Sequence, residues 1–159
     1  MSRHVCGIDP GDHGALAFHN KDRIVVYDMP VLRTTKTRTT PDINALVDLL
    51  VSMKPDRIFT EKLHPIPLGS NANFKLGGYL YLIRGICSAL DISLEEIPPK
   101  TWQSYFGIAN KPGTNTKSQA YLIASSMFPY IELSTKQGKI LDGRADAVLI
   151  CEYGHRRTQ

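Results

Sequence analysis

The sequence contains no apolar run close to the roughly 18 residues that a membrane-spanning helix needs. Its first residues also lack the charged, apolar and small-residue regions of a signal peptide. No internal repeat, low-complexity segment or linker divides the chain. The cysteines Cys6, Cys87 and Cys151 are odd in number and lie in apolar segments, which is typical of small buried hydrophobes in a reducing compartment. We therefore expect a soluble, cytosolic protein with one domain spanning residues 1–159.

Strong charge of either sign is also lacking, because 19 basic and 15 acidic residues leave a net charge of +4. Such a small excess favours polyanionic partners only mildly and says nothing about the fold. With 159 residues, of which 42% are hydrophobic, the chain can bury a substantial core.

Hydrophobic periodicity and turn residues predict an α/β fold with the element order β-β-β-α-β-α-β-α-α-α. Three consecutive strands with short turns indicate an antiparallel meander, and a helix before the fourth strand indicates a crossover that pairs it parallel to the first. Thr40 and Pro41 are predicted to be the N-cap and first-turn proline of the first helix. The expected strands cover residues 4–8, 14–19, 23–28, 57–60 and 93–97, and the expected helices cover residues 42–53, 71–90, 98–105, 116–128 and 142–153.

Four carboxylates occupy positions from which they can meet. Asp9 and Glu61 follow two short β-prone runs, and Asp142 and Asp146 lie four apart on one face of the last predicted helix. An acid at the end of a buried strand is costly unless a cation meets it. Oxygen ligands in this number suit Mg²⁺ or Mn²⁺ rather than zinc. The pattern predicts a divalent-metal site.

Each of these residues also has a simpler interpretation. Asp9 before Pro-Gly is a common turn initiator, and Glu61 could be a surface acid paired with Lys62. Asp142 could be a helix N-cap, and Lys117 an exposed helix residue. The conjunction favours the metal site, because four acids that converge at one sheet edge repel one another without cations.

Several motifs, taken in order, resemble a known family. They are Gly7-Ile-Asp-Pro-Gly11, Glu61 after the fourth strand, Lys75-Leu-Gly77, Pro98-Pro-Lys-Thr-Trp102, Lys117 ahead of Met127-Phe-Pro129, and Asp142-Gly-Arg-Ala-Asp146. Over nearly the whole chain this order is similar to RuvC-type Holliday-junction resolvases, particularly the compact versions found in bacteriophages. The resemblance implies a ribonuclease-H-like fold with a five-stranded mixed sheet flanked by helices. It also implies a Mg²⁺-dependent, homodimeric endonuclease that makes paired nicks across a four-way DNA junction in the cytosol of a bacterial or phage-infected cell.

The resemblance further implies site residues. The family's four catalytic, metal-binding acids fall on Asp9, Glu61, Asp142 and Asp146, and its active-site lysine falls on Lys117. Two ions, Mg²⁺ or substituting Mn²⁺, would activate water and stabilise the departing alkoxide. We hypothesise that Asp9 bridges both ions, that Glu61 holds the ion on the leaving-group side, and that Asp142 and Asp146 hold the ion carrying the nucleophilic water. Lys117 would stabilise phosphate charge or orient water. The last two acids are four apart where some members of the family have three.

Two groups of residues are predicted to contact DNA: basic side chains, and two residues in the segment that follows Glu61. The basic residues are Arg33, Lys36, Arg38, Lys75, Lys100, Lys111, Lys117, Lys136 and Lys139, and the others are Asn73 and Phe74. Phosphate contacts of this kind position DNA without reading its sequence. Phe74 could instead be a core residue, which its helical spacing with Gly78 and Leu82 favours. Trp102 and Tyr105 are expected in the core, and His13 and His64 are left outside the site.

The predicted helix over residues 71–90 contains Gly77, Gly78, Gly85, Ser88 and Ala89, although glycine disfavours helices. Small residues allow close backbone approach, either across a homodimer seam or against the protein's own sheet. The sequence leaves both open.

Other function classes fit part of the pattern. A ribonuclease-H-type enzyme acting on RNA–DNA hybrids would share the fold and the acids. The segment Gly7–Gly11 also resembles the phosphate loop of sugar kinases and Hsp70-like ATPases, but those need two such domains. A catalytically silent junction-binding module is disfavoured by the presence of all four acids. Whether a branch-migration partner is needed is left open.

Overall fold

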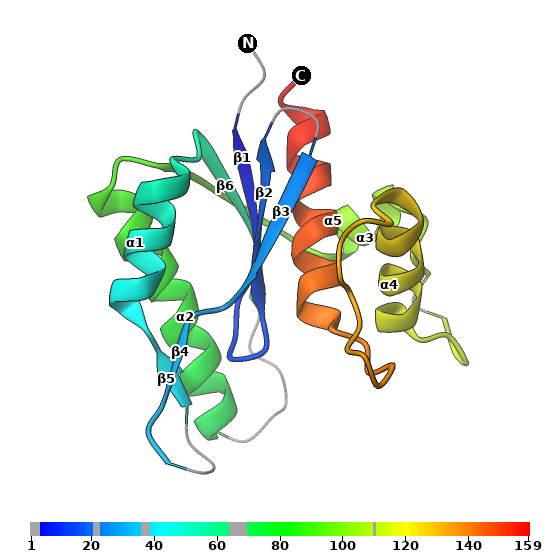
Figure 1. The fold of residues 1–159 in the computed structure, drawn as a ribbon, viewed down its shortest axis with the longest axis horizontal. Coiled ribbons are helices and arrows are strands. Elements are labelled where there is room, and N and C mark those ends of the chain that lie inside the picture. Colours follow the sequence, from blue (N-terminus) through cyan, green and yellow to red (C-terminus); the bar gives the residue numbers. More distant parts are fainter. Residues whose placement is uncertain (1–3, 21–22, 36–38, 64–69, 110) are drawn as a thin grey trace.

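The computed structural model describes residues 4–20, 23–35, 39–63, 70–109 and 111–159. Figure 1 shows a central sheet with helices on both sides. The strands are β1 (Val5–Asp9), β2 (Ala15–Asn20), β3 (Arg23–Asp28), β4 (Val31–Arg33), β5 (Thr39–Pro41), β6 (Arg57–Glu61) and β7 (Ser93–Ile97). The helices are α1 (Ile43–Met53), α2 (Ser70–Ala89), α3 (Pro99–Tyr105), α4 (Thr116–Met127) and α5 (Asp142–Arg157).

The main sheet has five strands in the order β3-β2-β1-β6-β7. The first three strands pair antiparallel, with Asp9 opposite Ala15 and Asn20 opposite Arg23. β6 pairs parallel to β1 and β7 pairs parallel to β6. The predicted meander, the crossover and the five-stranded mixed sheet are therefore confirmed.

The segment between β3 and α1 differs from the prediction. β4 and β5 form a separate two-stranded antiparallel sheet, so the element order has two short strands that the sequence did not indicate. Thr40 and Pro41 belong to β5, and the N-cap of α1 is Asp42, whose side chain accepts a hydrogen bond of 3.1 Å from the backbone N–H of Ala45. Pro41 is tolerated in β5 because an edge strand does not need every backbone donor.

Strand alternation divides the core into two layers. On one face of the sheet, α1 and α2 pack against a cluster that includes Cys6, Ile8 and Ile58. On the other face, α3, α4 and α5 pack against a cluster that includes Val5 and Phe59 (Figure 1). Side chains alternate between the two faces along a strand. Asp9 lies four residues after Val5 and Glu61 lies two residues after Phe59, so both side chains project on the α5 side of the sheet.

α5 lies unusually close to the sheet because its contact positions are small. A Cβ on Gly7 of β1 would meet the backbone N of Cys151 at 2.3 Å, and a Cβ on Gly143 would meet the carbonyl O of His13 at 2.1 Å. A Cβ on Gly154 would meet the Phe59 ring at 2.2 Å. This close packing, backbone against backbone at the first two positions, fixes the start of α5 beside the β1–β2 turn.

The three cysteines are buried and unpaired, as expected, and burial raises the pKa of Cys151 to about 12. Within the described residues, no helix has the length and apolar character needed to cross a membrane.

Candidate active site

The four predicted acids come together at the carboxyl ends of β1 and β6, beside the first turns of α5. Asp9 is the last residue of β1 and Glu61 is the last residue of β6, and these two strands are parallel neighbours. Because carboxyl ends of adjacent parallel strands lie at the same sheet edge, the two side chains emerge together. Gly143 packs against the turn that follows Asp9, which brings the first turns of α5 to this edge.

The electrostatics of the acids reflect this convergence. Burial raises the pKa of Asp9 well above its ordinary value, and the charges of Asp146, Glu61 and Asp142 raise it further. Burial, with Glu61 and Asp142, raises the pKa of Asp146 to about 7. Burial also raises the pKa of Glu61. A group of carboxylates that resists ionisation is a group that gains from a bound cation.

The positive charge of Lys117 on α4 lowers the pKa values of Asp9 and Asp146 against the larger effect of burial. Its ammonium pairs with Asp142. Burial opposes ionisation of Asp142, but the hydrogen bond and charge of Lys117 bring its pKa below the ordinary value. Lys117 is itself exposed, so its ammonium can also meet an anion from solvent.

Glu61 has a different partner, because Trp102 of α3 donates a hydrogen bond of 3.1 Å from Nε1 to Glu61 Oε1. This contact lowers the pKa of Glu61 against the larger effect of burial. Within the described part of the chain, no three His, Cys, Asp or Glu side chains stand ready as a preformed metal cage. Instead, Glu61 contacts Trp102 and Asp142 contacts Lys117.

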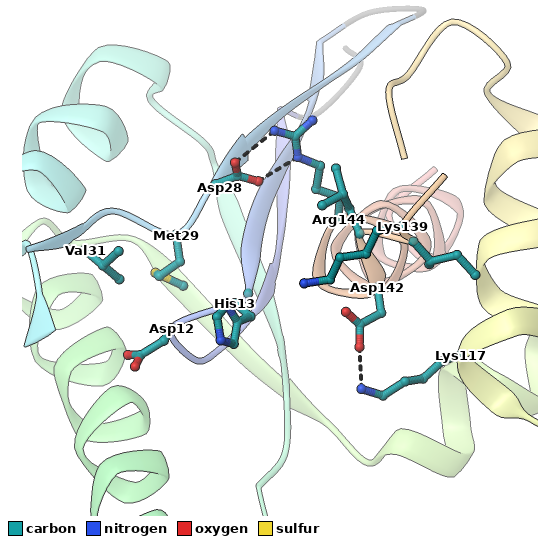
Figure 2. A pocket seen from close by; sticks show the side chains of 12 residues that line it. Asp12, His13, Asp28, Met29, Val31, Lys117, Lys139, Asp142 and Arg144 are labelled. Carbon is teal, nitrogen blue, oxygen red and sulfur yellow. Dashed lines mark hydrogen bonds and ion pairs between the residues drawn. The ribbon is translucent and has the colours of Figure 1, made fainter. Parts of the chain in front are cut away.

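A cleft of about 430 Å³ lies beside the β1–β2 turn, and Asp142 is the member of the acid cluster that lines it (Figure 2). It shares Lys117 and Asp142 with the acid cluster, and Lys139 and Arg144 extend into it from the α5 side. Arg144 forms hydrogen bonds of 2.6 and 2.9 Å with Asp28 of β3. The cleft is therefore a polar recess that reaches the acid cluster at Asp142.

A second network ties the β1–β2 turn to the β4–β5 hairpin and α2. The Asp12 carboxylate accepts hydrogen bonds from Thr39 and Lys75, and from the Tyr79 hydroxyl at 2.7 Å. These bonds outweigh the effect of burial and lower the pKa of Asp12. Lys75, predicted to contact DNA, is thus an ion-pair partner of Asp12 in this structure.

The remaining predicted DNA contacts are mostly exposed and scattered over several elements. Lys36 and Arg38 lie outside the described residues, as does His64, and Asn73 is half-buried. The exposed basic side chains are Arg33 on β4, Lys100 on α3, and Lys111, Lys136 and Lys139 in loops. Figure 1 places the β4–β5 hairpin and the amino ends of α2 and α4 at the same end of the molecule as the β1–β2 turn.

Two aromatic predictions are wrong. Phe74 is 85% exposed and Tyr105 is 48% exposed, whereas Trp102 is in the core at 1%. Helical spacing suggested that Phe74 faces inward, but the inward face of α2 is formed by Tyr79, Ile83 and Ile86. Phe74 therefore lies on the outer side, where it is free to contact another molecule.

The glycines of α2 also face outward. Among the residues that the structure describes, a Cβ on Gly77, Gly78 or Gly85 would meet nothing within 4 Å, so these glycines are not needed for packing on the protein's own sheet. Beside them, an apolar groove of about 330 Å³ is lined by Val47, Tyr81, Leu82, Gly85, Ile86, Ala89 and Leu90.

Sequence reasoning missed the polar partners that surround the acids. Trp102 was expected only as a core residue, although it ends the motif Pro98-Pro-Lys-Thr-Trp102 on which part of the resemblance rests. No sequence pattern indicated the interactions of Asp12, Asp28 and Arg144, because their partners are distant in sequence.

Comparisons with known proteins agree with this geometry at the level of the fold. The sequence matches no protein-family model and no curated protein. Thermus thermophilus RuvC in complex with a Holliday-junction substrate superposes with a TM-score of 0.68 at 16% identity, over 98% of this chain and 95% of that one. The fowlpox virus resolvase bound to junction DNA gives 0.58 at 15% identity, over 98% of both chains. The yeast mitochondrial Holliday-junction resolvase gives 0.59 at 16% identity, over 98% of this chain and 78% of that one. The chain therefore has the ribonuclease-H-like fold of the RuvC-type junction resolvases.

Proposed function

We propose that this protein is a divalent-metal-dependent DNA endonuclease that resolves four-way junctions by paired, symmetric nicks. The observation that carries the proposal is the convergence of Asp9, Glu61, Asp142 and Asp146, with Lys117, at one edge of the sheet in a fold shared with junction resolvases. Neither the acids nor the fold would suffice alone, because this fold supports other activities.

The donor set fits Mg²⁺ or Mn²⁺. All four side chains offer hard oxygen ligands. Burial and the neighbouring carboxylates raise the pKa values of Asp9 and Asp146, and burial raises the pKa of Glu61, so a bound cation would favour the ionised form of each. A pair of bound ions would supply activation of water and stabilisation of charge on the phosphate and the leaving oxygen. Lys117 contacts Oδ2 of Asp142, so an ion bound by Asp142 would either use the other oxygen or displace Lys117 from this pairing.

Release of Lys117 from Asp142 has a chemical consequence. The freed ammonium would be a compact positive charge next to the site, where it can hold a non-bridging phosphate oxygen. Asp9 and Asp146, which lie on neighbouring elements, would remain the fixed carboxylates. Trp102 would keep Glu61 oriented through its indole N–H.

Two symmetric cuts require two sites related by a two-fold axis, and we place the homodimer seam on the outer face of α2. The open space at Gly77, Gly78 and Gly85 and the exposure of Tyr81, which is 69% accessible, support this placement. Basic side chains at the acid-bearing end would hold the DNA arms, so binding should weaken steeply as salt rises.

The testing experiment is cleavage of an immobile four-way DNA junction with Mg²⁺, beside a linear duplex and an RNA–DNA hybrid of the same sequence. Asp9→Asn, which keeps the side-chain shape but removes charge, is the inactive control. Paired nicks at symmetric positions in the junction alone, absent from the variant, are the expected result. Cutting confined to the RNA strand of the hybrid would instead assign a ribonuclease, and full junction cleavage by Asp9→Asn would disprove the assignment of the acids.

A further inference from the structure

The cleft of Figure 2 is lined by several charged side chains besides those of the acid cluster. Its carboxylates are Asp12, Asp28 and Asp142, which come from the β1–β2 turn, from β3 and from α5. Each of them has a cationic partner: Asp12 pairs with Lys75, Asp28 with Arg144, and Asp142 with Lys117. The negative charges of the cleft are therefore all compensated.

Lys139 is the cation that remains. Among the described residues, none forms a side-chain hydrogen bond or ion pair with its ammonium, although it lines the same cleft as Asp142. His13 lies on the opposite wall, on an exposed turn. The cleft thus offers, on its wall, one exposed positive charge without a partner among the described residues, which an anion entering the cleft can meet.

The backbone that carries Lys139 is held by its own hydrogen bonds. Thr135 N donates to Lys139 O at 2.8 Å, Lys139 N donates to Thr135 Oγ1 at 3.2 Å, and Leu141 N donates to Leu133 O at 2.9 Å. Gly138 has a φ of +82°, a conformation that favours glycine, just before Lys139. The lysine is therefore presented by a defined turn that runs directly into α5 and Asp142.

We propose that this cleft binds a single backbone phosphate of the DNA strand being cut, next to the phosphate held at the four acids, with Lys139 as its principal charged contact and His13 on the facing wall. The inference rests on the proposed nuclease function. It follows from continuity, because the cleft shares Lys117 and Asp142 with the acid cluster, so a chain seated at the acids has its neighbouring phosphate at the cleft. A phosphodiester is an anion that needs one cationic contact and little apolar surface.

The test measures junction binding as a function of salt in an Asp9→Asn background, which prevents cutting. Loss of one phosphate contact should reduce the slope of log affinity against log salt by about 0.9, so we expect this reduction for Lys139→Gln. Lys54→Gln, which removes the same charge from an exposed position at the opposite end of the sheet, should keep the full slope.

Neutral methylphosphonate linkages placed one at a time beside the cut position then identify the phosphate. One such linkage should weaken binding of the Lys139-containing protein as much as Lys139→Gln does, and should cause no further loss in that variant. An unchanged slope for Lys139→Gln, or additive losses at every linkage, would overturn the inference while leaving the proposed function intact. If the wild-type protein neither binds nor cuts the junction, the proposed function fails and the inference falls with it.

Discussion

At the scale of single residues, the carboxylates at the sheet edge destabilise the protein in the absence of metal. The pKa of Asp146 is raised to about 7 by burial, Glu61 and Asp142, whereas an unfolded chain would return it to about 3.9. Between these values the folded state holds a proton that the unfolded state has lost. The folded state therefore loses stability as pH rises through 7, which is opposite to the usual behaviour of a salt-bridged aspartate.

We predict that the metal-free protein gains about 1 kcal/mol of unfolding free energy when pH falls from 8 to 6, with Asp9 adding to the gain in the same direction. Denaturant-induced unfolding at pH 8 and pH 6, with a chelator present to remove metal, measures this change in unfolding free energy. Asp146→Asn should be more stable than the wild type at pH 8 and should lose most of this gain. Comparing the two proteins cancels the contribution of the histidines, and equal pH responses would refute the prediction.

The hydrogen bond between Trp102 and Glu61 leads to a second prediction. Trp102→Phe removes the indole donor while keeping an aromatic ring in the core, so the pKa of Glu61 should rise. Loss of a group that orients a metal ligand typically costs 10- to 100-fold in metal affinity or activity. We expect weaker Mn²⁺ binding by about that factor, measured by calorimetry, and an acid limb of the cleavage profile shifted to higher pH.

A packing defect alone would also weaken binding, so the control is a double variant. In a Glu61→Ala background, Trp102→Phe should cause little further loss of Mn²⁺ affinity, because the acceptor of the indole hydrogen bond is already removed. If the two losses simply add, Trp102 acts through core packing and not through Glu61.

At the scale of elements, the close approach of α5 to the sheet is what brings Asp146 to Asp9. Gly7→Ala would place a Cβ within 2.6 Å of three backbone atoms of α5, and backbone cannot move aside as a flexible side chain can. We predict a loss of more than about 3 kcal/mol in unfolding free energy, or no folded protein. Gly77→Ala is the matched control when made in a Gly85→Arg protein, in which the proposed seam is blocked: its Cβ meets nothing among the described residues, so it should stabilise α2 by about 0.5–1 kcal/mol. Thermal melts of both variants test this.

The elements that were predictable share a strong local signal. The five main strands and the five helices have apolar residues at a clear period, and Asp9 and Glu61 could be placed because they follow such runs directly. The β4–β5 hairpin has three-residue strands in a polar, threonine-rich stretch, so no periodicity can show it. Its attachment depends instead on Thr39 and Lys75 meeting Asp12, which are contacts between residues far apart in sequence.

The prediction that Phe74 lies in the core was wrong for a related reason. α2 has small residues on its outer side, so the helical spacing of Phe74, Gly78 and Leu82 matched an inward stripe as well as an outward one. The hydrogen-bond partner of Glu61 could not be predicted from the sequence either. Trp102 lies 41 positions away, and a hydrogen bond between distant residues produces no periodic pattern in the sequence. The sequence thus predicted that the acids meet at one sheet edge, but it did not predict the side chains that form hydrogen bonds with them.

At the scale of the whole molecule, the open face of α2 bears on assembly. Glycines that nothing in the protomer requires, beside an apolar groove and an exposed Tyr81, weaken an isolated helix without any benefit to the monomer. A second copy packed along this face would bury the groove and place two acid clusters in a two-fold arrangement. The helix composition is then explained by close approach between protomers.

We therefore predict that Gly85→Arg produces a folded monomer. The side chain enters open space in the protomer and arginine favours helices more than glycine does, so the protomer should stay folded. A charge in the seam should block association and remove only the stabilisation that association supplies. Light scattering after size exclusion measures the mass, and a cruciform plasmid reports coupling, because paired nicks give linear DNA and single nicks give open circles. Ser126→Arg, on the exposed surface of α4, is the control with the same added charge. A Gly85→Arg protein that stays dimeric and still linearises the plasmid would place the seam on another face, whereas a stable monomer that only nicks would tie the two-fold assembly at α2 to the pairing of the cuts.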